Sequence, residues 1–225
     1  MTTIATDGKT MYADVRSTNT NPLHYACNDC GSTGFANKQE SRKITVLHRV
    51  NPDAHRFVDG KVAMMYGCAG SSNLQSFLRG IWTERSDLSH IIAAFSFVNM
   101  EKTTIPDGGA LIVTEDNSVY RFSISPKKKL FALAKIKEKD LPVSIGSGSP
   151  YFLTYRESFN IGWFDAFQMA IHRDPHSSTD ICHGAWIDHS ERPEKPVVVK
   201  HDEEIQFPRT YEQTLAMAQR RMKLS

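Results

Sequence analysis

The order of strand-like and helix-like segments is the strongest constraint on what this chain can fold into. Segments with strand character occur at residues 2–6, 9–14, 43–47, 61–66, 110–114, 118–122, 143–145, 181–187 and 197–200. Helical spacing of apolar residues occurs in two pairs of segments, 74–81 with 88–98 and 150–159 with 163–172, and again at 210–224. Strands grouped in hairpins, with helix pairs kept apart from them, predict an α+β fold with antiparallel sheets and outer helices.

The first two strands are joined at Asp7-Gly8, which is a strong signal for a two-residue hairpin turn. Such a turn lays Ala13 opposite Thr2 and brings Asp14 beside the start of the chain. The register alone does not decide to which face of the sheet Asp14 points.

Residues 17–42 interrupt this pattern. They are rich in Asn, Ser, Thr, Gly and Cys without periodicity, which predicts a loop insertion within a single domain spanning residues 1–225. Cys27 and Cys30 form one Cys-x-x-Cys pair there, with His24 nearby. The pair is either half of a zinc site or an incidental loop pair. We favour the second interpretation because a structural zinc site needs four ligands.

The composition limits the classes of function. A formal net charge of +2, with no run of five or six basic residues, argues against a nucleic-acid surface. Residues 1–15 lack the features of a signal peptide, and the apolar run at 91–95 is too short to span a membrane. Four cysteines do not make a disulfide framework, so a reducing compartment is expected. We therefore predict a cytoplasmic globular protein without nucleic-acid or membrane partners.

Thr2 is the first candidate for chemistry. A threonine hydroxyl is a poor nucleophile unless a base takes its proton, and a chain-terminal threonine supplies that base as its own α-amine. The ordinary pKa of an α-amine is about 8, so a useful fraction is neutral near pH 7. Removal of Met1 would expose Thr2 in this form. Many chains begin Met-Thr, so this feature alone is weak evidence.

Thr2 is followed by further landmarks in a fixed order. The six are Thr2-Thr3-Ile4, Ala13-Asp14, Lys43-Ile44, Gly67-Cys68-Ala69-Gly70, Gly146-Ser147-Gly148-Ser149 and Arg173-Asp174-Pro175-His176-Ser177. This ordered set resembles the β-type subunits of proteasomes and the bacterial peptidase HslV, which are N-terminal nucleophile (Ntn) hydrolases. The resemblance implies a four-layer αββα sandwich, with two antiparallel sheets packed face to face between helix pairs.

The resemblance also implies roles for individual residues. Thr2 would be the nucleophile of a threonine-type endopeptidase, with its α-amine as proton acceptor. The ammonium of Lys43 would favour the alkoxide, and Asp14 would hold Lys43 by a charge-assisted hydrogen bond. The backbone N–H of Gly70 would stabilise the oxyanion of the tetrahedral intermediate.

The remaining implied roles belong to the surroundings of Thr2. Ser147, Asp174 and Ser177 would form a hydrogen-bonded shell around the amine and the hydroxyl. Cys68 lies where this family places the floor of its main specificity pocket, which suggests a medium-sized apolar side chain in the substrate. Each residue singled out also has an ordinary structural explanation, as a turn cap, a strand-edge lysine, a tight packing glycine or a helix cap.

No cofactor is expected to be required. The segment Thr179-Asp180-Ile181-Cys182 resembles an HslV stretch whose backbone holds a monovalent cation or a magnesium ion, with Ala185 near its end. The sequence departs from that stretch at residues 183–185, which weakens the expectation of an ion. Residues 186–225 exceed the HslV length and are expected to form a C-terminal extension.

The function predicted from these features is hydrolysis of peptide bonds through an ester on Thr2. A homo-oligomeric ring acting on peptides or unfolded proteins, with an ATP-dependent unfoldase as a further partner, is implied by the resemblance. Two alternatives remain. One is a catalytically silent ring or scaffold subunit that acts by protein–protein interaction, and the other is an Ntn amidase that acts on a small amide.

Overall fold

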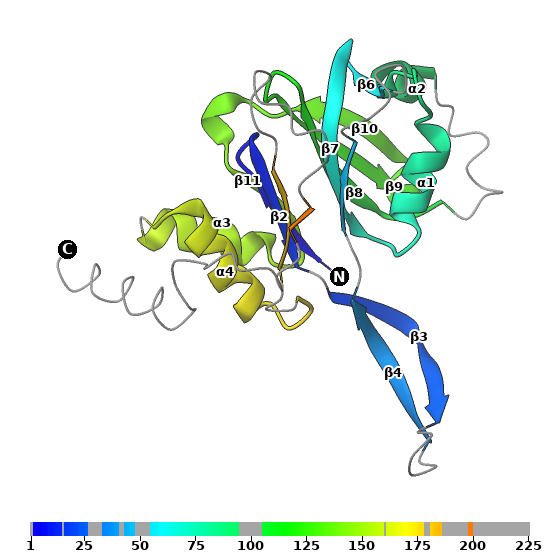
Figure 1. Cartoon of the computed structure of the whole chain (residues 1–225), viewed down its shortest axis with the longest axis vertical. Helices are drawn as coiled ribbons and strands as arrows, with labels where there is room; N and C mark the ends of the chain where they lie inside the picture. Colours follow the sequence, from blue (N-terminus) through cyan, green and yellow to red (C-terminus); the bar gives the residue numbers. More distant parts are fainter. Residues whose placement is uncertain are drawn as a thin grey trace.

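The structure is a computed structural model of the 225-residue chain. It describes residues 2–14, 16–26, 33–40, 43–47, 55–94, 105–159, 161–177, 181–185 and 198–199. Two antiparallel sheets form its centre, and helices cover their outer faces (Figure 1).

The first sheet contains the N-terminal strands and has five members in the order β11-β1-β2-β12-β13. Their bounds are Val143–Gly146 for β11, Thr3–Thr6 for β1, Thr10–Asp14 for β2, Ile181–Ala185 for β12 and Val198–Val199 for β13. Both neighbours of β1 pair with it antiparallel, so the start of the chain lies inside the sheet rather than at its edge.

The second sheet follows the order β10-β9-β8-β7-β5, and the short strand β6 also pairs with β7. Their bounds are Leu130–Lys135 for β10, Val119–Ser125 for β9, Gly108–Thr114 for β8, Lys61–Gly70 for β7, Ile44–Val46 for β5 and Phe57–Val58 for β6. Two short 3-10 turns, Pro126–Lys128 and Glu138–Asp140, flank β10.

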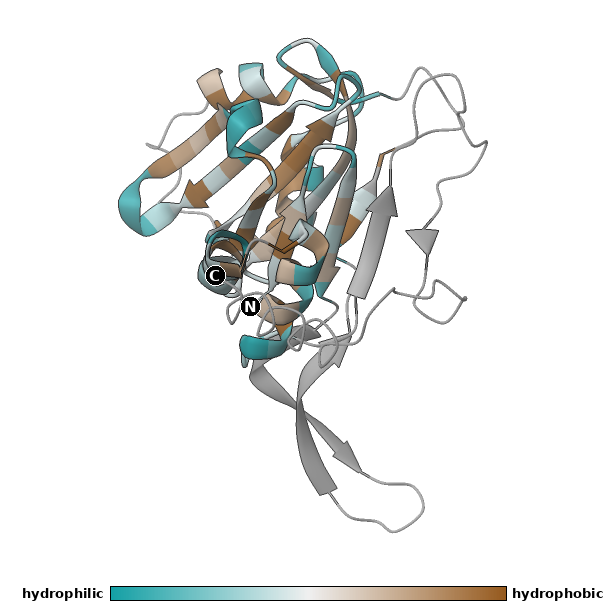
Figure 2. Cartoon of the chain, turned by 90° about the vertical axis from the view of Figure 1, so that its left-hand side faces the viewer, coloured by the Kyte–Doolittle hydropathy of each residue, from teal (hydrophilic) through white to brown (hydrophobic). Residues whose placement is uncertain are grey.

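Three apolar clusters separate the four layers. Between the sheets, Ile4 and Met11 from the first sheet pack with Met65, Leu111 and Val113 from the second. This central cluster appears as the hydrophobic strand segments in the middle of Figure 2. The exclusion of water from both inner faces stabilises the face-to-face packing.

Helices α1 (Leu74–Ile81) and α2 (Leu88–Ala94) cover the outer face of the second sheet. In α1 the residues Leu74 and Leu78 are one turn apart and both fully buried, so one side of the helix faces the sheet.

Helices α3 (Ser149–Phe159) and α4 (Trp163–Arg173) cover the first sheet, where Phe152 and Phe167 are fully buried. The predicted four-layer αββα sandwich is confirmed.

The N-terminal hairpin has a longer turn than expected. Ala13 pairs with Ile4 rather than with Thr2, and the last pair before the turn is Thr6 with Met11. The side chain of Asp7 explains the difference, because its Oδ1 accepts hydrogen bonds from the backbone N–H groups of residues 9 and 10 at 2.8 and 2.7 Å. The prediction of a two-residue turn is therefore wrong.

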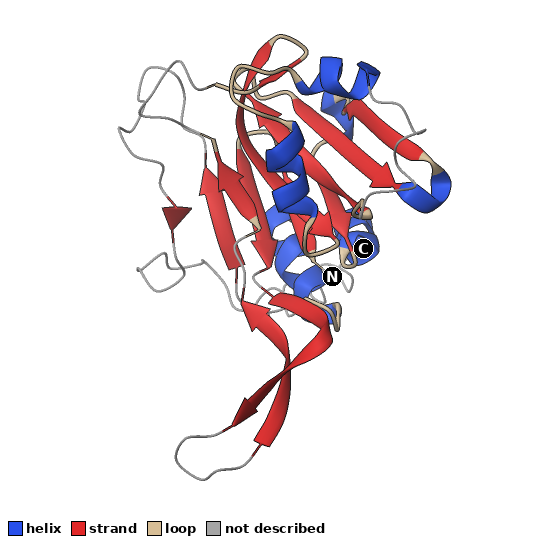
Figure 3. Ribbon diagram, turned by 90° about the vertical axis from the view of Figure 1, so that its right-hand side faces the viewer, coloured by secondary structure: helices blue, strands red, loops and turns tan. Residues whose placement is uncertain are grey.

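Strands β3 (Arg16–Ala26) and β4 (Thr33–Glu40) pair antiparallel as a two-stranded sheet, where a loop insertion was expected. This two-stranded sheet projects from the sandwich in Figure 3.

Cys27 and Cys30 lie outside the described residues, as do residues 186–225 apart from 198–199. Strand β10 was not predicted, and β7 continues four residues beyond its predicted end.

Candidate active site

The backbone at the start of β1 is held from both sides. The carbonyl oxygen of Thr2 accepts a hydrogen bond from the backbone N–H of Ser147 at 2.9 Å. The backbone N–H of Thr3 donates to Oδ1 of Asp14 at 2.7 Å. Thr2 is buried, with 5% of its surface exposed. The path of the chain through its first residues is thus fixed by hydrogen bonds to the backbone of Thr2 and Thr3.

Asp14 links this backbone to a buried ammonium group. Its Oδ2 accepts a hydrogen bond from Nζ of Lys43 at 3.0 Å, and both side chains are almost completely shielded from water. Lys43 directly precedes β5, and Asp14 ends β2, so the pair joins the two sheets. A buried ion pair needs good geometry and further hydrogen bonds to offset its desolvation. The N–H of Thr3 provides one such bond.

The hydroxyl of Thr3 is the centre of a second polar cluster. Its Oγ1 accepts a hydrogen bond from the backbone N–H of Gly148 at 3.0 Å. It also lies 2.8 Å from Oγ of Ser177 and 3.3 Å from Oδ2 of Asp174. Thr3 and Ser177 are both buried. The side chain of the second threonine therefore connects β1 with the segment that follows α4.

Asp174 accepts several hydrogen bonds that favour its ionised form. Ser147 and Ser177 donate through their hydroxyl groups to Oδ2, the latter at 2.7 Å, and the backbone N–H of His176 donates to Oδ1 at 3.0 Å. Burial alone would raise the pKa of Asp174. The hydrogen bonds, with a smaller contribution from the charge of His176, hold the pKa below its ordinary value of 3.8.

Two glycines make room for the first two threonines. Gly146 has a φ of +99°, and a Cβ at that position would lie 1.6 Å from the carbonyl oxygen of Thr2. A Cβ at Gly148 would lie 2.2 Å from Oγ1 of Thr3. No real side chain tolerates such distances. The Gly-Ser-Gly sequence therefore permits the close approach of this segment to β1.

Strand β7 passes along the other side of Lys43. The backbone N–H of Cys68 donates to the carbonyl oxygen of Lys43 at 3.1 Å. Two residues later the strand ends at Gly70, whose φ is +134° and where a Cβ would lie 2.4 Å from the carbonyl oxygen of Asp107. Burial raises the pKa of the Cys68 thiol to about 12, although the nearby charge of Arg79 acts in the opposite direction.

Most of the predicted site residues are brought together by these contacts. The connected set is Thr2, Asp14, Lys43, Ser147, Asp174 and Ser177. Cys68 and Gly70 lie on the strand adjacent to Lys43. Sequence reasoning missed Thr3 and Gly148 as members of the cluster. The only signal for them is their position beside Thr2 and Ser147 in the same two motifs.

The expected backbone ion site stays a prediction. Thr179 lies outside the described residues, and Cys182 and Ala185 belong to β12, whose backbone pairs with β2 along its whole length. Within the described part of the chain, no group of three or more His, Cys, Asp or Glu residues is placed to hold a metal. In the same part, no helix is long and apolar enough to cross a membrane.

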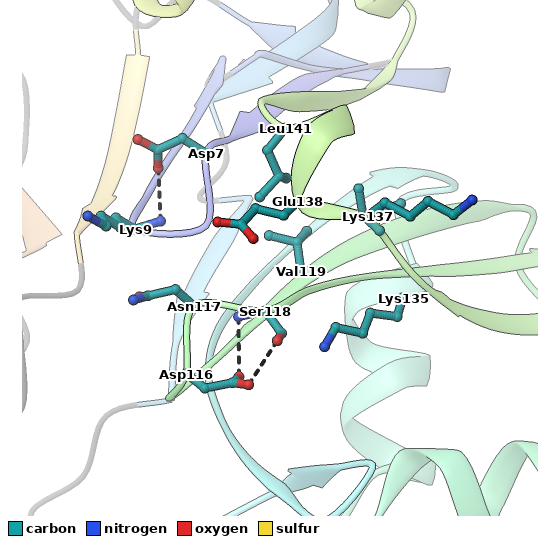
Figure 4. Close-up of a pocket in the computed structure, with 11 residues that line it drawn as sticks. Asp7, Lys9, Asp116, Asn117, Ser118, Val119, Lys135, Lys137, Glu138 and Leu141 are labelled. Carbon is teal, nitrogen blue, oxygen red and sulfur yellow. Dashed lines mark hydrogen bonds between the residues drawn. The ribbon is translucent and has the colours of Figure 1, made fainter.

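A cavity of about 660 Å³ lies at the other end of β1, beside the turns of two hairpins (Figure 4). Its lining includes Asp7 and Lys9 from the first turn, Asn117 from the turn between β8 and β9, and Lys137. Figure 4 shows the side chains of Lys9 and Lys137 pointing away from each other and outward. They do not converge on a common ligand, so this cavity is not a second candidate site.

The comparisons with known proteins agree with the fold and correct the expected family. No family model matches the chain, and no curated protein matches its sequence. An Anbu (Gly-1) mutant from Hyphomicrobium sp. strain MC1 matches with a TM-score of 0.53 and 10% identity, covering 99% of this chain and 93% of that one. The helical assembly of the Anbu complex from Pseudomonas aeruginosa matches with a TM-score of 0.51 and 13% identity, covering 100% and 97%.

Identities this low show a common fold alone. The predicted membership of the proteasome β-type and HslV-like peptidase family is wrong, because the similar structures are Anbu proteins, which form a related but distinct group. This chain therefore has the fold of the Anbu proteins, which is an Ntn-related fold.

Proposed function

We propose that this protein is an Ntn-type hydrolase that cleaves peptide bonds with Thr2 as nucleophile, after Met1 has been removed. The observation that supports this most strongly is the arrangement of two polar clusters around one short backbone segment. The Asp14–Lys43 pair holds the N–H of Thr3, and the Asp174 cluster holds its hydroxyl. Such preorganisation is what acyl transfer requires, because its barrier is lowered by groups fixed before reaction.

In the proposed reaction the α-amine takes the proton of the Thr2 hydroxyl, and Oγ1 attacks the carbonyl carbon of the substrate. The ammonium of Lys43 stabilises the developing negative charge on Oγ1, and the N–H of Gly70 is proposed to donate to the oxyanion. The C–N bond breaks when the α-ammonium returns the proton to the leaving amine. Water then attacks the resulting ester and releases the acid, which regenerates the Thr2 hydroxyl.

The roles of the other residues follow from their hydrogen bonds. Ser147 is proposed to orient the α-amine, because its N–H holds the Thr2 carbonyl and its hydroxyl contacts Asp174. Asp174 and Ser177 keep this arrangement in place through Thr3. No resident cofactor has a part in this proposal.

We further propose that copies of this chain assemble into a homo-oligomer in the cytoplasm. One of the similar structures is a helical assembly of the Anbu complex, which supports an oligomer but not specifically the predicted ring. An unfoldase partner stays a prediction that no observation tests. The scaffold alternative remains the main competitor, because a fold at 10–13% identity does not carry an activity with it.

The test begins with the mass of the purified protein and its reaction with a threonine-directed β-lactone. The proposal expects a chain without Met1, labelled once at Thr2 and active on fluorogenic peptides. Thr2→Ala should lose both labelling and turnover, whereas Thr154→Ala, at an exposed threonine of α3, should keep both. Retention of Met1 in the native host, without labelling, would favour the scaffold. Turnover of small amides but not of peptides would favour the amidase.

A further inference from the structure

A cluster of hydrogen-bond donors lies on the same side of the second sheet as Lys43. Oγ1 of Thr45 accepts hydrogen bonds from Nε2 of Gln75 at 2.6 Å and from Nη2 of Arg79 at 3.3 Å. Nε of Arg79 also donates to the hydroxyl of Tyr66 at 3.2 Å. Gln75 and Arg79 are one turn apart on α1, so both reach the sheet from the same face of the helix.

The strand register places this cluster next to the site. Thr45 pairs with Tyr66, and directly paired residues of an antiparallel ladder project from the same face. The backbone N–H of Cys68 donates to the carbonyl oxygen of Lys43, so this pairing continues one residue before β5. Residues two apart in such a ladder share a face, which puts Lys43 on the face of Thr45 and Cys68 on that of Tyr66. Two residues of a strand span about 6.6 Å. The hydrogen bond between Arg79 and Thr45 therefore lies two residues along this face from Lys43.

The charges on this face are not equivalent. The ammonium of Lys43 is already paired with the carboxylate of Asp14. Among the described residues, the hydrogen-bond partners found for the guanidinium of Arg79 are two neutral hydroxyl groups. Arginine has five N–H donors, and these two bonds leave others for an incoming acceptor. The side chain of Arg79 is exposed at the surface, so an acceptor can approach it.

From this juxtaposition we infer that Arg79, with Gln75 and Thr45, determines substrate specificity, and that the residue preceding the cleaved bond is Glu or Gln. This inference rests on the proposed function. A carboxylate gains a charge-assisted hydrogen bond from the guanidinium, and a carboxamide gains neutral bonds from the same donors. An apolar side chain such as Leu offers no acceptor to the remaining N–H groups of Arg79. The apolar preference expected from the sequence rests on Cys68 alone.

The experiment uses the chain without Met1 and three fluorogenic peptides that differ only in Glu, Gln or Leu before the cleaved bond. We expect kcat/KM for Glu and Gln to exceed that for Leu by roughly tenfold or more. Arg79→Met should remove the advantage of Glu, so that kcat/KM for the Glu peptide no longer exceeds that for the Leu peptide, and Arg79→Lys should restore part of this advantage. Arg121→Met also removes one arginine charge, from an exposed position on β9. It should leave the ranking of kcat/KM among the three peptides unchanged. Thermal melting confirms that each variant is folded.

The outcomes separate this inference from the proposed function. Hydrolysis that depends on Thr2 but prefers Leu, or does not discriminate, overturns the inference and leaves the function standing. If no peptide is cleaved, the proposed function fails, and binding of the same peptides to the Thr2→Ala protein decides the inference. Tighter binding of the Glu peptide that is lost in Arg79→Met supports it, and equal binding of all three overturns it.

Discussion

The hydroxyl of Thr3 lies 2.8 Å from the hydroxyl of Ser177, although 174 residues separate them in the sequence. The same oxygen of Thr3 accepts a hydrogen bond from the backbone N–H of Gly148. One side chain next to the proposed nucleophile thus ties β1 to two distant segments. A methyl group in place of this hydroxyl would leave a buried N–H without an acceptor, at a cost of about 1–3 kcal/mol.

Thr3→Val tests this role, because valine has nearly the shape of threonine. We expect the free energy of unfolding to fall by about 1–3 kcal/mol in chemical denaturation, and kcat to fall by tenfold or more with little change in KM. Thr3→Ser retains the hydroxyl and should recover most of kcat. Thr154→Val, on the exposed side of α3, serves as control and should stay within about 0.5 kcal/mol of the parent. A fully active Thr3→Val protein would contradict a positioning role.

The contacts of Thr3 could not be predicted from the sequence. Its partners Gly148, Asp174 and Ser177 lie 145 to 174 residues away, and no local spacing indicates which of two adjacent threonines they will contact. The antiparallel strands and the helix pairs were predictable because their apolar periods are local and strong, as in α1, whereas the four-layer stacking was implied by the family resemblance. Asp14 was predictable because the N-terminal hairpin brings it back to the start of the chain.

Two other parts of the fold, the turn after β1 and strand β10, are determined by interactions that the local sequence pattern does not indicate. The turn after β1 lengthened because the carboxylate of Asp7 binds two backbone N–H groups, which the Asp-Gly signal does not reveal. Strand β10, with the sequence Leu-Phe-Ala-Leu-Ala-Lys, has no clear alternation, and its residues are half-buried or exposed. Pairing with β9 determines its conformation, and pairing is a tertiary event.

The buried pair of Asp14 and Lys43 should contribute to the stability of the fold and to turnover in ways that different variants can separate. Lys43→Met keeps the length of the side chain but leaves the carboxylate of Asp14 buried without its cation. We expect a loss of about 3–5 kcal/mol in the free energy of unfolding, together with loss of turnover. The double variant with Asp14→Asn removes the stranded charge and should recover much of the stability, measured by denaturant titration. Turnover should not return, because the ammonium proposed to act on Thr2 is still missing.

Asp174 predicts a dependence of stability on pH. Its folded pKa lies below the ordinary 3.8 of the unfolded chain, so the unfolded state takes up a proton first as the pH falls. The stabilisation is therefore complete above about pH 4 to 5 and is lost as the pH falls through the lower folded value. Asp174→Asn should be less stable at pH 7 and show a shallower decline between about pH 5 and 2. Asp140→Asn, at an exposed position, is the control for the removal of one carboxylate.

The thiol of Cys68 should react slowly in the folded protein. The thiolate is the reactive form, and burial raises the pKa of this group to about 12. At pH 8 the thiolate fraction is then about one part in ten thousand. Peptide mapping after treatment with iodoacetamide should show little alkylation of Cys68 in the native state and rapid alkylation in denaturant. Fast modification of the folded protein would contradict the raised pKa of this thiol.

Gly148 and Thr3 form a pair in which one substitution should partly correct the other. In Gly148→Ala the new Cβ would lie 2.2 Å from Oγ1 of Thr3 and 3.0 Å from its Cγ2. The φ of Gly148 does not fall in the left-handed region, so the clash with Thr3 is the main obstacle. We expect Gly148→Ala to be destabilised and inactive, by thermal melting and peptide turnover.

Thr3→Ala removes both clashing atoms and leaves only a contact of 3.2 Å between Cβ of residue 3 and the new methyl group. The double variant should therefore melt closer to the parent than Gly148→Ala alone, while turnover stays low because the hydroxyl that holds Ser177 is absent. Gly80→Ala is the matched control, since a Cβ there meets nothing within 4 Å and alanine favours the helix. If the double variant is no more stable than Gly148→Ala, the close approach of this glycine to Thr3 is not what excludes a side chain.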